Sequence, residues 1–366
     1  MDAPLRSWRL SGAVCLGIAL GITTWIGMLS LRPKVPNFRV LLHSLERPML
    51  AGAASPIIGE GVDTPAQEIE ARVLFVGDIM LDRNVAYRTR QAGNPNYPFQ
   101  KLPVGWFDSF DYAVGNLEGP VTDRRRSPEK SIDFIFDPSV APVLKAQGLD
   151  AFSQANNHAL DQGAAGYEDS VRRLREAGLL VFGHQVLDGS LSLATTTVRG
   201  ITFAFVGYNT TDNPMDKAQA GPVIQQAARE ADMVIAFMHW GAEYKDRPQA
   251  GMIADAHWLI DQGADAVIGG HPHWAQGFSS YKGKPIAWSL GNFIFDQDWS
   301  VQTRQGLAVA LTVKGGKITL EPMPLTIDQS RPTLVQGEEL IKRLQGLANI
   351  SDEGLREQIR AGKMEF

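Results

Sequence analysis

The chain has 366 residues, with 35 basic and 40 acidic side chains and a formal net charge of −5. This balance excludes the broad basic field of a general nucleic-acid-binding protein, so we expect no nucleic acid among its partners. The single cysteine, Cys15, excludes intrachain disulfides and cysteine-ligated metal sites.

The first predicted element is an apolar segment over residues 10–31 that contains no charged side chain. It is long enough for one bilayer crossing, and its apolar core is longer than that of a cleaved signal peptide. We therefore expect residues 1–32 to be a single-pass anchor in the cell membrane, with the main domain extracytoplasmic. Basic residues flank both ends, so the positive-inside rule leaves the orientation open, and a weakly membrane-associated helix is the alternative. Residues 33–70, rich in Pro, Ala and Gly, are expected to be a linker.

The folded domain is predicted over residues 71–328, where short apolar strands alternate with amphipathic helices and several hairpins. In chain order, strands are expected at 72–77, 111–115, 150–154, 193–198, 201–206, 232–238, 264–268, 285–290, 307–313 and 317–320, and helices at 84–91, 138–147, 167–177, 222–231 and 250–261. This pattern predicts an α/β fold with mixed sheets and helices on their outer faces. Residues 329–366 are expected to form an exposed, polar, helical tail.

Five of the strands end in side chains that commonly bind metal ions. These residues are Asp78, Asn116 with Glu118, Asn157 with His158, His239, and His271 with His273. Because sites in open α/β sheets form beyond the carboxyl ends of strands, we expect these residues to converge on one site. Oxygen and imidazole donors without thiolate suit Mn²⁺, Zn²⁺, Fe or Mg²⁺, and a set of this size can hold one or two divalent ions.

Each of these residues also has a plainer interpretation. Pro272 fixes the backbone between His271 and His273, which suits a shared metal site but equally a polar turn after a core strand. Asp78 can cap the following helix, and His239 can be a packed strand-end residue. The other polar residues after strands can simply form turns. We prefer the metal site because chance rarely supplies such donors after five separate strands.

Two side chains are predicted to act on the reacting group. His158 can protonate a leaving oxygen or stabilise the transition state. Arg83 can bind an anionic group as a bidentate fork, or it can pair structurally with Asp78 or Glu118. A basic region formed by residues 124–126 and Lys130 can attract an acidic polymer, although a solvated loop is the alternative.

Several motifs together resemble a known family. They are Val76-Gly77-Asp78-Ile-Met-Leu-Asp82-Arg83, Gly115-Asn-Leu-Glu118-Gly-Pro, Ala155-Asn-Asn-His158-Ala-Leu-Asp161-Gln-Gly163, Met238-His-Trp-Gly-Ala-Glu-Tyr244, Gly270-His-Pro-His273 and Ser289-Leu-Gly-Asn-Phe-Ile-Phe-Asp296. In this order, over about residues 72–325, they resemble the CapA-type capsule biosynthesis proteins, also called poly-γ-glutamate synthesis proteins. That family is related to the calcineurin-like metallophosphoesterases. The resemblance therefore implies a four-layer αββα sandwich of two mixed β-sheets between helices.

The resemblance also implies a role for each residue. Asp78 corresponds to the first metal aspartate, and Glu118 or Asn116 to the bridging carboxylate region. The Asn-His pair corresponds to Asn157 and His158, and the later histidine ligands correspond to His239, His271 and His273. The phosphoesterases place a histidine two residues after the first aspartate, and this chain has Met80 there. The capsule-type family shares this loss, which weakens one of the two metal sites.

Two functions follow as hypotheses. The first is a metal-dependent hydrolase acting on a phosphoester or a related anionic bond at the cell envelope, assisted by His158 and Arg83. The second is a non-catalytic component that binds an anionic polymer, or membrane partner proteins, during capsule assembly and export. Met80 favours the second hypothesis, whereas the presence of every other ligand-type residue favours the first.

Overall fold

The structure is a computed structural model that describes residues 69–183 and 192–366. The predicted anchor, residues 1–32, and residues 33–68 of the predicted linker lie outside the described residues. Every helix within the described part of the chain is too short or too polar to span a bilayer.

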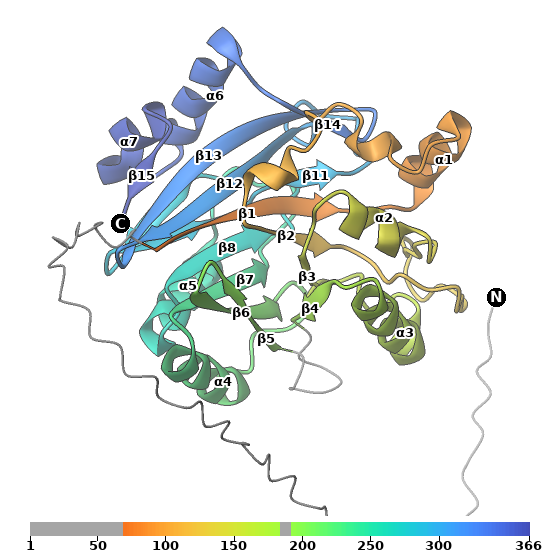
Figure 1. Ribbon diagram of the computed structural model, residues 1–366, viewed down its shortest axis with the longest axis horizontal. Coiled ribbons are helices and arrows are strands. Elements are labelled where there is room, and N and C mark those ends of the chain that lie inside the picture. Colours follow the sequence, from red (N-terminus) through yellow and green to blue (C-terminus); the bar gives the residue numbers. More distant parts are fainter. Residues whose placement is uncertain (1–68, 184–191) are drawn as a thin grey trace, which may run out of the picture. The chain divides into compact units, whose positions relative to one another are not determined.

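The larger of two β-sheets is mixed. Its strands are β1 (Glu70–Ile79), β2 (Tyr112–Leu117), β3 (Ala151–Ser153), β4 (Leu180–Phe182), β11 (Asn292–Ile294), β12 (Gln305–Lys314), β13 (Lys317–Asp328), β14 (Arg331–Leu334) and β15 (Met364–Glu365). Their order is β14-β13-β12-β1-β2-β3-β4, with β11 beside β1 and β15 beside β13 (Figure 1). Strands β1 to β4 are parallel, whereas β12, β13 and β14 pair antiparallel with their neighbours.

The smaller sheet is also mixed. Its strands are β5 (Leu193–Val198), β6 (Ile201–Asn209), β7 (Met233–His239), β8 (Ala266–Gly270), β9 (Phe278–Tyr281) and β10 (Lys284–Ala287). They lie in the order β5-β6-β7-β8-β10-β9, and the four inner strands are parallel. The edge strands β5 and β9 are antiparallel to their neighbours.

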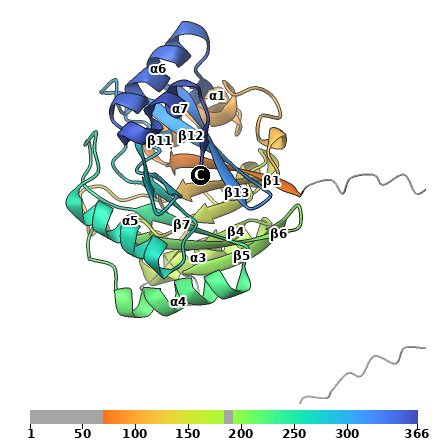
Figure 2. The same ribbon diagram turned by 90° about the vertical axis from the view of Figure 1, so that its left-hand side faces the viewer.

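The α-helices in the described part of the chain are α1 (Arg83–Ala92), α2 (Val140–Ala146), α3 (Gly163–Glu176), α4 (Lys217–Glu230), α5 (Ala250–Gln262), α6 (Gly337–Asn349) and α7 (Arg356–Arg360). Short 3₁₀ helices occupy Tyr97–Phe99, Phe107–Ser109 and Glu353–Leu355. Helices α1 to α3 cover the outer face of the larger sheet, and α4 and α5 cover that of the smaller sheet (Figures 1 and 2).

Alternating side chains of the central strands fill separate cores. Val73 and Phe75 of β1 lie in a core between the two sheets, packed with Phe205 and Phe237 of the smaller sheet. Leu74, one position along β1, faces the core beneath the outer helices. Because both faces of β1 are covered, its sequence is a continuous apolar run rather than an alternating one. The expected arrangement of two mixed sheets between helical layers is therefore confirmed.

Three expectations about helices differ from the structure. Helix α3 begins at Gly163, four residues before the expected start at residue 167. Helix α4 begins at Lys217, five residues before the expected start at residue 222, because the Asp216 carboxylate accepts hydrogen bonds from the backbone N–H groups of Ala218 and Gln219 and caps the helix there. Pro222 consequently lies inside the helix and not in its first turn.

The C-terminal segment is not an exposed tail. Residues 329–366 contain helices α6 and α7, as the helical prediction required, but Leu347, Ile359 and Met364 are buried in the core between the sheets. Strand β15 also pairs with β13. The apolar face of this segment therefore docks on the domain, which the high proportion of charged residues in the sequence concealed.

Candidate metal centre

The carboxyl ends of four strands, two from each sheet, meet at the candidate centre. Asp78 of β1 lies beside Asn116 of β2 in the larger sheet, and His239 of β7 lies beside Gly270 of β8 in the smaller one. A Cβ atom on Gly270 would lie only 2.7 Å from Oδ1 of Asp78. Glycine is therefore required where the two sheets approach each other.

Strand β1 changes neighbours immediately before Asp78. It pairs antiparallel with β12 up to Val76 and then parallel with β11 from Asp78 onward. A Cβ atom on Gly77 would meet the carbonyl oxygen of Gly291 at 2.0 Å, and the Asp78 N–H donates to that same oxygen at 2.9 Å. This irregularity places the fully buried Asp78 side chain at the meeting point of the sheets.

A chain of amide side chains orients Asp78. Asn156 donates from Nδ2 to the Leu117 carbonyl oxygen at 2.9 Å, and its Oδ1 accepts from the His158 N–H at 3.1 Å. These backbone contacts fix the amide, so Asn156 also donates to Oδ1 of Asn116 at 3.0 Å. Asn116 in turn donates from Nδ2 to Oδ1 of Asp78 at 2.8 Å. Asn116 thus positions Asp78, and the ligand role expected for it stays a prediction.

His239 connects two other predicted ligands. Its Nε2 lies 2.9 Å from Oδ1 of Asn157 and 3.1 Å from Nδ1 of His271. Burial, followed by the neighbouring imidazoles, lowers the pKa of His239 well below its usual value. Burial also lowers the pKa of His271 to about 4. Both rings are therefore neutral at neutral pH, the form in which imidazole binds a metal.

Asn292 fixes the orientation of His273. Its Nδ2 donates to the carbonyl oxygen of Thr303 at 3.0 Å, so its Oδ1 is the atom that faces Nδ1 of His273, at 2.9 Å. Nδ1 of His273 therefore carries the proton that is donated. The other ring nitrogen, Nε2, lies 3.8 Å from Oε1 of Glu118. This is the tautomer that leaves Nε2 free to bind a cation.

Glu118 is fully buried, and neither of its carboxylate oxygens has a hydrogen-bond partner among the described residues. Burial, and next the charge of Asp78, raises the pKa of Glu118 well above its usual value. Burial by itself lowers the pKa of His273, but the charges of Glu118 and Asp78 outweigh this effect and raise the pKa to about 9. Glu118 exerts this effect only while it is ionised. The three side chains therefore share a proton at neutral pH, on the imidazole or on the carboxyl group.

The same three side chains fit a divalent cation. One ligand atom from each of Asp78, Glu118 and His273 lies within 4.8 Å of the others. A buried carboxylate without a donor is costly, and a cation would satisfy both of its oxygens and replace the shared proton. Carboxylate oxygen and imidazole nitrogen are donors that suit the metal ions expected from the sequence.

His158 lies at the edge of this group. Its Nδ1 lies 2.6 Å from Oδ2 of Asp161, which also accepts from the Phe134 N–H at 2.8 Å. Asp161 is therefore an acceptor, and His158 donates from Nδ1 and keeps Nε2 free. The imidazole packs on the Phe134 ring, with 4.1 Å between centroids. This pairing suits a general acid or base held in one orientation.

Arg83 does not pair with Asp78 or Glu118. Its guanidinium forms an ion pair with Asp296 and lies over the rings of Phe134 and Phe295 at 5.0 and 5.8 Å. The Phe295 ring packs against His273, with centroids 4.8 Å apart. Arg83 therefore stands above the two phenylalanines that adjoin His158 and His273, and its side chain is 36% exposed.

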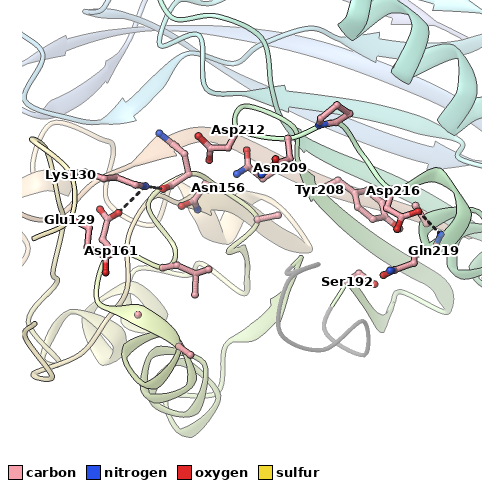
Figure 3. Close-up of a pocket in the computed structure, with 18 of the residues that line it drawn as sticks. Glu129, Lys130, Asn156, Asp161, Ser192, Tyr208, Asn209, Asp212, Asp216 and Gln219 are labelled. Carbon is pink, nitrogen blue, oxygen red and sulfur yellow. Dashed lines mark hydrogen bonds and ion pairs between the residues drawn. The ribbon is translucent and has the colours of Figure 1, made fainter. Parts of the chain in front are cut away.

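A cavity of about 670 Å³ adjoins the centre, and Asn156, Asn157 and Asp161 form part of its wall (Figure 3). The opposite wall comes from β6 and the segment leading into α4, with Asp212 and Asp216 among its residues. Two cations of the predicted basic region line the cavity, but Arg126 is paired with Glu129 and Lys130 with Asp161. These pairs leave little free positive charge for an acidic polymer there.

Sequence reasoning missed three residues of this region or gave them no role. Asp161 and Asn292 lie within the family-like motifs, and their functions appear only when their partners, His158 and His273, are known. Glu243 was not selected, although one carboxylate oxygen lies within 4.8 Å of ligand atoms of His271 and His273. It lies in an exposed loop, four positions after His239 and within the family-like motif at residues 238–244, and that position was the available signal.

Comparisons with known proteins agree with the motifs. A family model described as bacterial capsule synthesis protein PGA_cap matches residues 72–297, more than half of the chain. The PGA biosynthesis protein CapA of Bacillus subtilis is 29% identical over 80% of this chain and 81% of its own length. The capsule biosynthesis protein CapA of Bacillus anthracis is 30% identical over 70% of this chain and 68% of its own. Among solved structures, a hypothetical protein from Thermus thermophilus is 19% identical, covers 72% of this chain and 96% of its own, and gives a TM-score of 0.41.

Proposed function

Because the chain belongs to the PGA_cap family of bacterial capsule synthesis proteins, we propose that it is a metal-dependent hydrolase of capsule biosynthesis, acting on a phosphoester or a related anionic bond at the cell envelope. The names of the two Bacillus relatives supply the biological setting. In this proposal the apolar segment within residues 1–32 holds the domain at the membrane, on its extracytoplasmic side.

The observation that carries the proposal is the buried carboxylate of Glu118, which has no hydrogen-bond partner within the described part of the chain and lies beside Asp78 and His273. A folded protein rarely keeps such a group without a compensating partner, and a divalent cation is the partner that all three side chains accept. His239, His271 and Asn157 lie in the same connected group and are the remaining candidate ligands.

A bound divalent cation would supply a Lewis acid and lower the pKa of a coordinated water. His158 is placed to hold or deliver a proton at Nε2, because Asp161 accepts the hydrogen bond from Nδ1 and fixes the orientation of the ring. Arg83 presents a partly exposed guanidinium that can share its charge between Asp296 and an anionic substrate group. The cavity beside Asn157 and Asp161 supports substrate access from the α4 side (Figure 3).

The presence of Met80 where the phosphoesterases have a histidine favours the second candidate, a non-catalytic component that binds an anionic polymer or membrane partner proteins. The Met80 side chain is fully buried, and its sulfur accepts the N–H of Asp82 at 3.1 Å. The position therefore contributes no ligand, and the centre has one donor fewer than the phosphoesterase resemblance implies.

The test is the metal content and phosphoester turnover of the purified full-length chain, stripped with a chelator and reloaded with Mn²⁺, Zn²⁺, Fe²⁺ or Mg²⁺. We expect cation-dependent turnover that Asp78→Asn and His271→Ala each reduce at least a hundredfold. His257→Ala is the matched control, because His257 stacks on Tyr281 and belongs to none of the contacts of the centre. Tight cation binding without turnover supports the binding component, whereas the absence of cation binding overturns both candidates.

A further inference from the structure

Glu243 lies on the solvent side of the candidate centre, on the loop that follows β7. Its side chain is exposed, whereas His271 and His273 are buried. One ligand atom from each of these three residues lies within 4.8 Å of the others. This outer group shares His273 with the inner group of Asp78 and Glu118.

The backbone holds Glu243 against the two histidines. The N–H of Tyr244, the next residue, donates to the carbonyl oxygen of Pro272 at 2.9 Å, and Pro272 is the residue between the histidines. The Lys245 carbonyl oxygen accepts from Nε2 of Gln276 at 3.0 Å. The position of Glu243 is therefore set by contacts on its C-terminal side and does not depend on a bound ion.

This arrangement uses unfavourable backbone conformations. Tyr244 has a φ of 60°, and His271 and His273 have φ values of 92° and 57°. A left-handed backbone conformation costs on the order of 1 kcal/mol at each residue that is not glycine. Conformations of this kind persist where the surrounding structure enforces them, and they are frequent at ligand sites. The turn that carries the histidines and the loop that carries Glu243 are thus strained on both sides of their shared hydrogen bond.

The inner group cannot satisfy a second ion. Met80 offers no ligand, since its sulfur accepts the Asp82 N–H. Nδ1 of His273 donates to Asn292, so only its Nε2 is available, and one lone pair serves one cation at a time. The unpartnered oxygens of Glu118 indicate a cation on the buried side of that nitrogen. A cation on the solvent side therefore depends on His271 and on a further anionic donor, and Glu243 is the carboxylate in reach.

We propose that Glu243 is a ligand of an outer divalent cation, which it holds with His271 beside the inner cation of Asp78 and Glu118. The inference rests on the proposed metal centre and adds Glu243 to it as a ligand of the second position. Because Nε2 of His273 serves the inner cation and Glu243 is exposed to water, the outer cation binds more weakly. The chain then takes up two equivalents of unequal affinity.

The experiment is a titration of the metal-free, full-length chain with Mn²⁺, measured by isothermal titration calorimetry. A parallel titration with Co²⁺ is measured by the visible absorption of the bound Co²⁺. Glu243→Gln should weaken the second equivalent at least tenfold, change the Co²⁺ absorption of that equivalent, and leave the first equivalent within about threefold of wild type. Asp246→Asn is the matched control, since Asp246 is an exposed acid on the same loop outside both groups. Thermal melts of the metal-free variants should coincide with wild type.

The outcomes separate the two proposals. Two equivalents with unchanged affinities in Glu243→Gln overturn the role of Glu243, and a single equivalent in the wild-type chain overturns the outer position. In both cases the inner centre still stands. No bound cation in the wild-type chain overturns the proposed function itself.

Discussion

Oδ1 of Asn292 accepts a hydrogen bond from Nδ1 of His273 at 2.9 Å. The bond joins β11, which lies beside β1 in the larger sheet, to the turn after β8 in the smaller sheet. It determines which ring nitrogen of His273 faces Glu118, so a residue outside the ligand group sets the chemistry of the group.

Replacing Asn292 by alanine should weaken cation binding about 10- to 100-fold, because His273 then loses the acceptor that fixes its tautomer. Calorimetric titration with Mn²⁺ measures the effect, and a melt of the metal-free protein reports the stability lost with the Thr303 contact. The exposed Asn349 of α6 gives the control variant Asn349→Ala. Unchanged affinity in Asn292→Ala would show that the ring is oriented by other contacts.

Cation binding should release a proton and become tighter as the pH rises from 7 toward 9. The neighbouring carboxylates raise the pKa of His273 to about 9, so below that pH a proton occupies the group and competes with the cation. Calorimetry in two buffers with different ionisation enthalpies counts the protons released. An affinity that stays flat between pH 7 and 9 contradicts the shared proton.

Replacing Gly270 by alanine should destabilise the protein by about 1–3 kcal/mol and reduce cation binding, because the new methyl group would lie 2.7 Å from Oδ1 of Asp78. Urea denaturation measures the free energy of unfolding. Gly346 in α6 has open space around its Cβ position, so Gly346→Ala should instead stabilise by about 0.5–1 kcal/mol. A tolerated Gly270→Ala would mean that the sheets can separate at this point.

The stability of the domain should fall in acid partly through Asp169. Although burial opposes it, hydrogen bonds from Thr122, Arg172 and Arg173 hold the pKa of Asp169 below its usual value. A depressed pKa in the folded state gives stability that is present above the unfolded pKa, near 4, and lost as the pH falls through the folded one. Asp169→Asn should therefore cost about 2 kcal/mol at pH 7 and progressively less toward pH 2. Urea denaturation at several pH values tests this, and a constant difference refutes it.

His158→Ala should reduce turnover about 10²- to 10⁴-fold while leaving the cation content unchanged, since its Nε2 serves the reacting group in the proposed mechanism. Metal analysis of the same preparations separates the two effects. A loss of bound cation in this variant would instead make His158 a ligand.

The sequence predicted the convergence of the strand-end residues because parallel strands place their carboxyl ends at one edge, and the register pairs Asp78 with Asn116 and His239 with Gly270. It did not predict that Asn116 orients Asp78, because this role depends on the hydrogen bonds that Asn116 makes with Asn156 and Asp78. Glu243 was missed because an exposed loop carries no periodic pattern. The start of α4 was expected at residue 222 because the cap at Asp216 was not recognised.

Asp78 and Glu118 come from the larger sheet and its following loop, whereas His271 and His273 follow a strand of the smaller sheet. An ion held by both sets would add a cross-tie to the hydrogen bonds that already join the sheets at this edge, such as those from His271 to Asp78 and from His273 to Asn292. Withdrawal of the ion should therefore loosen the seam between the sheets, and amide hydrogen exchange should accelerate first at the ends of β1 and β8.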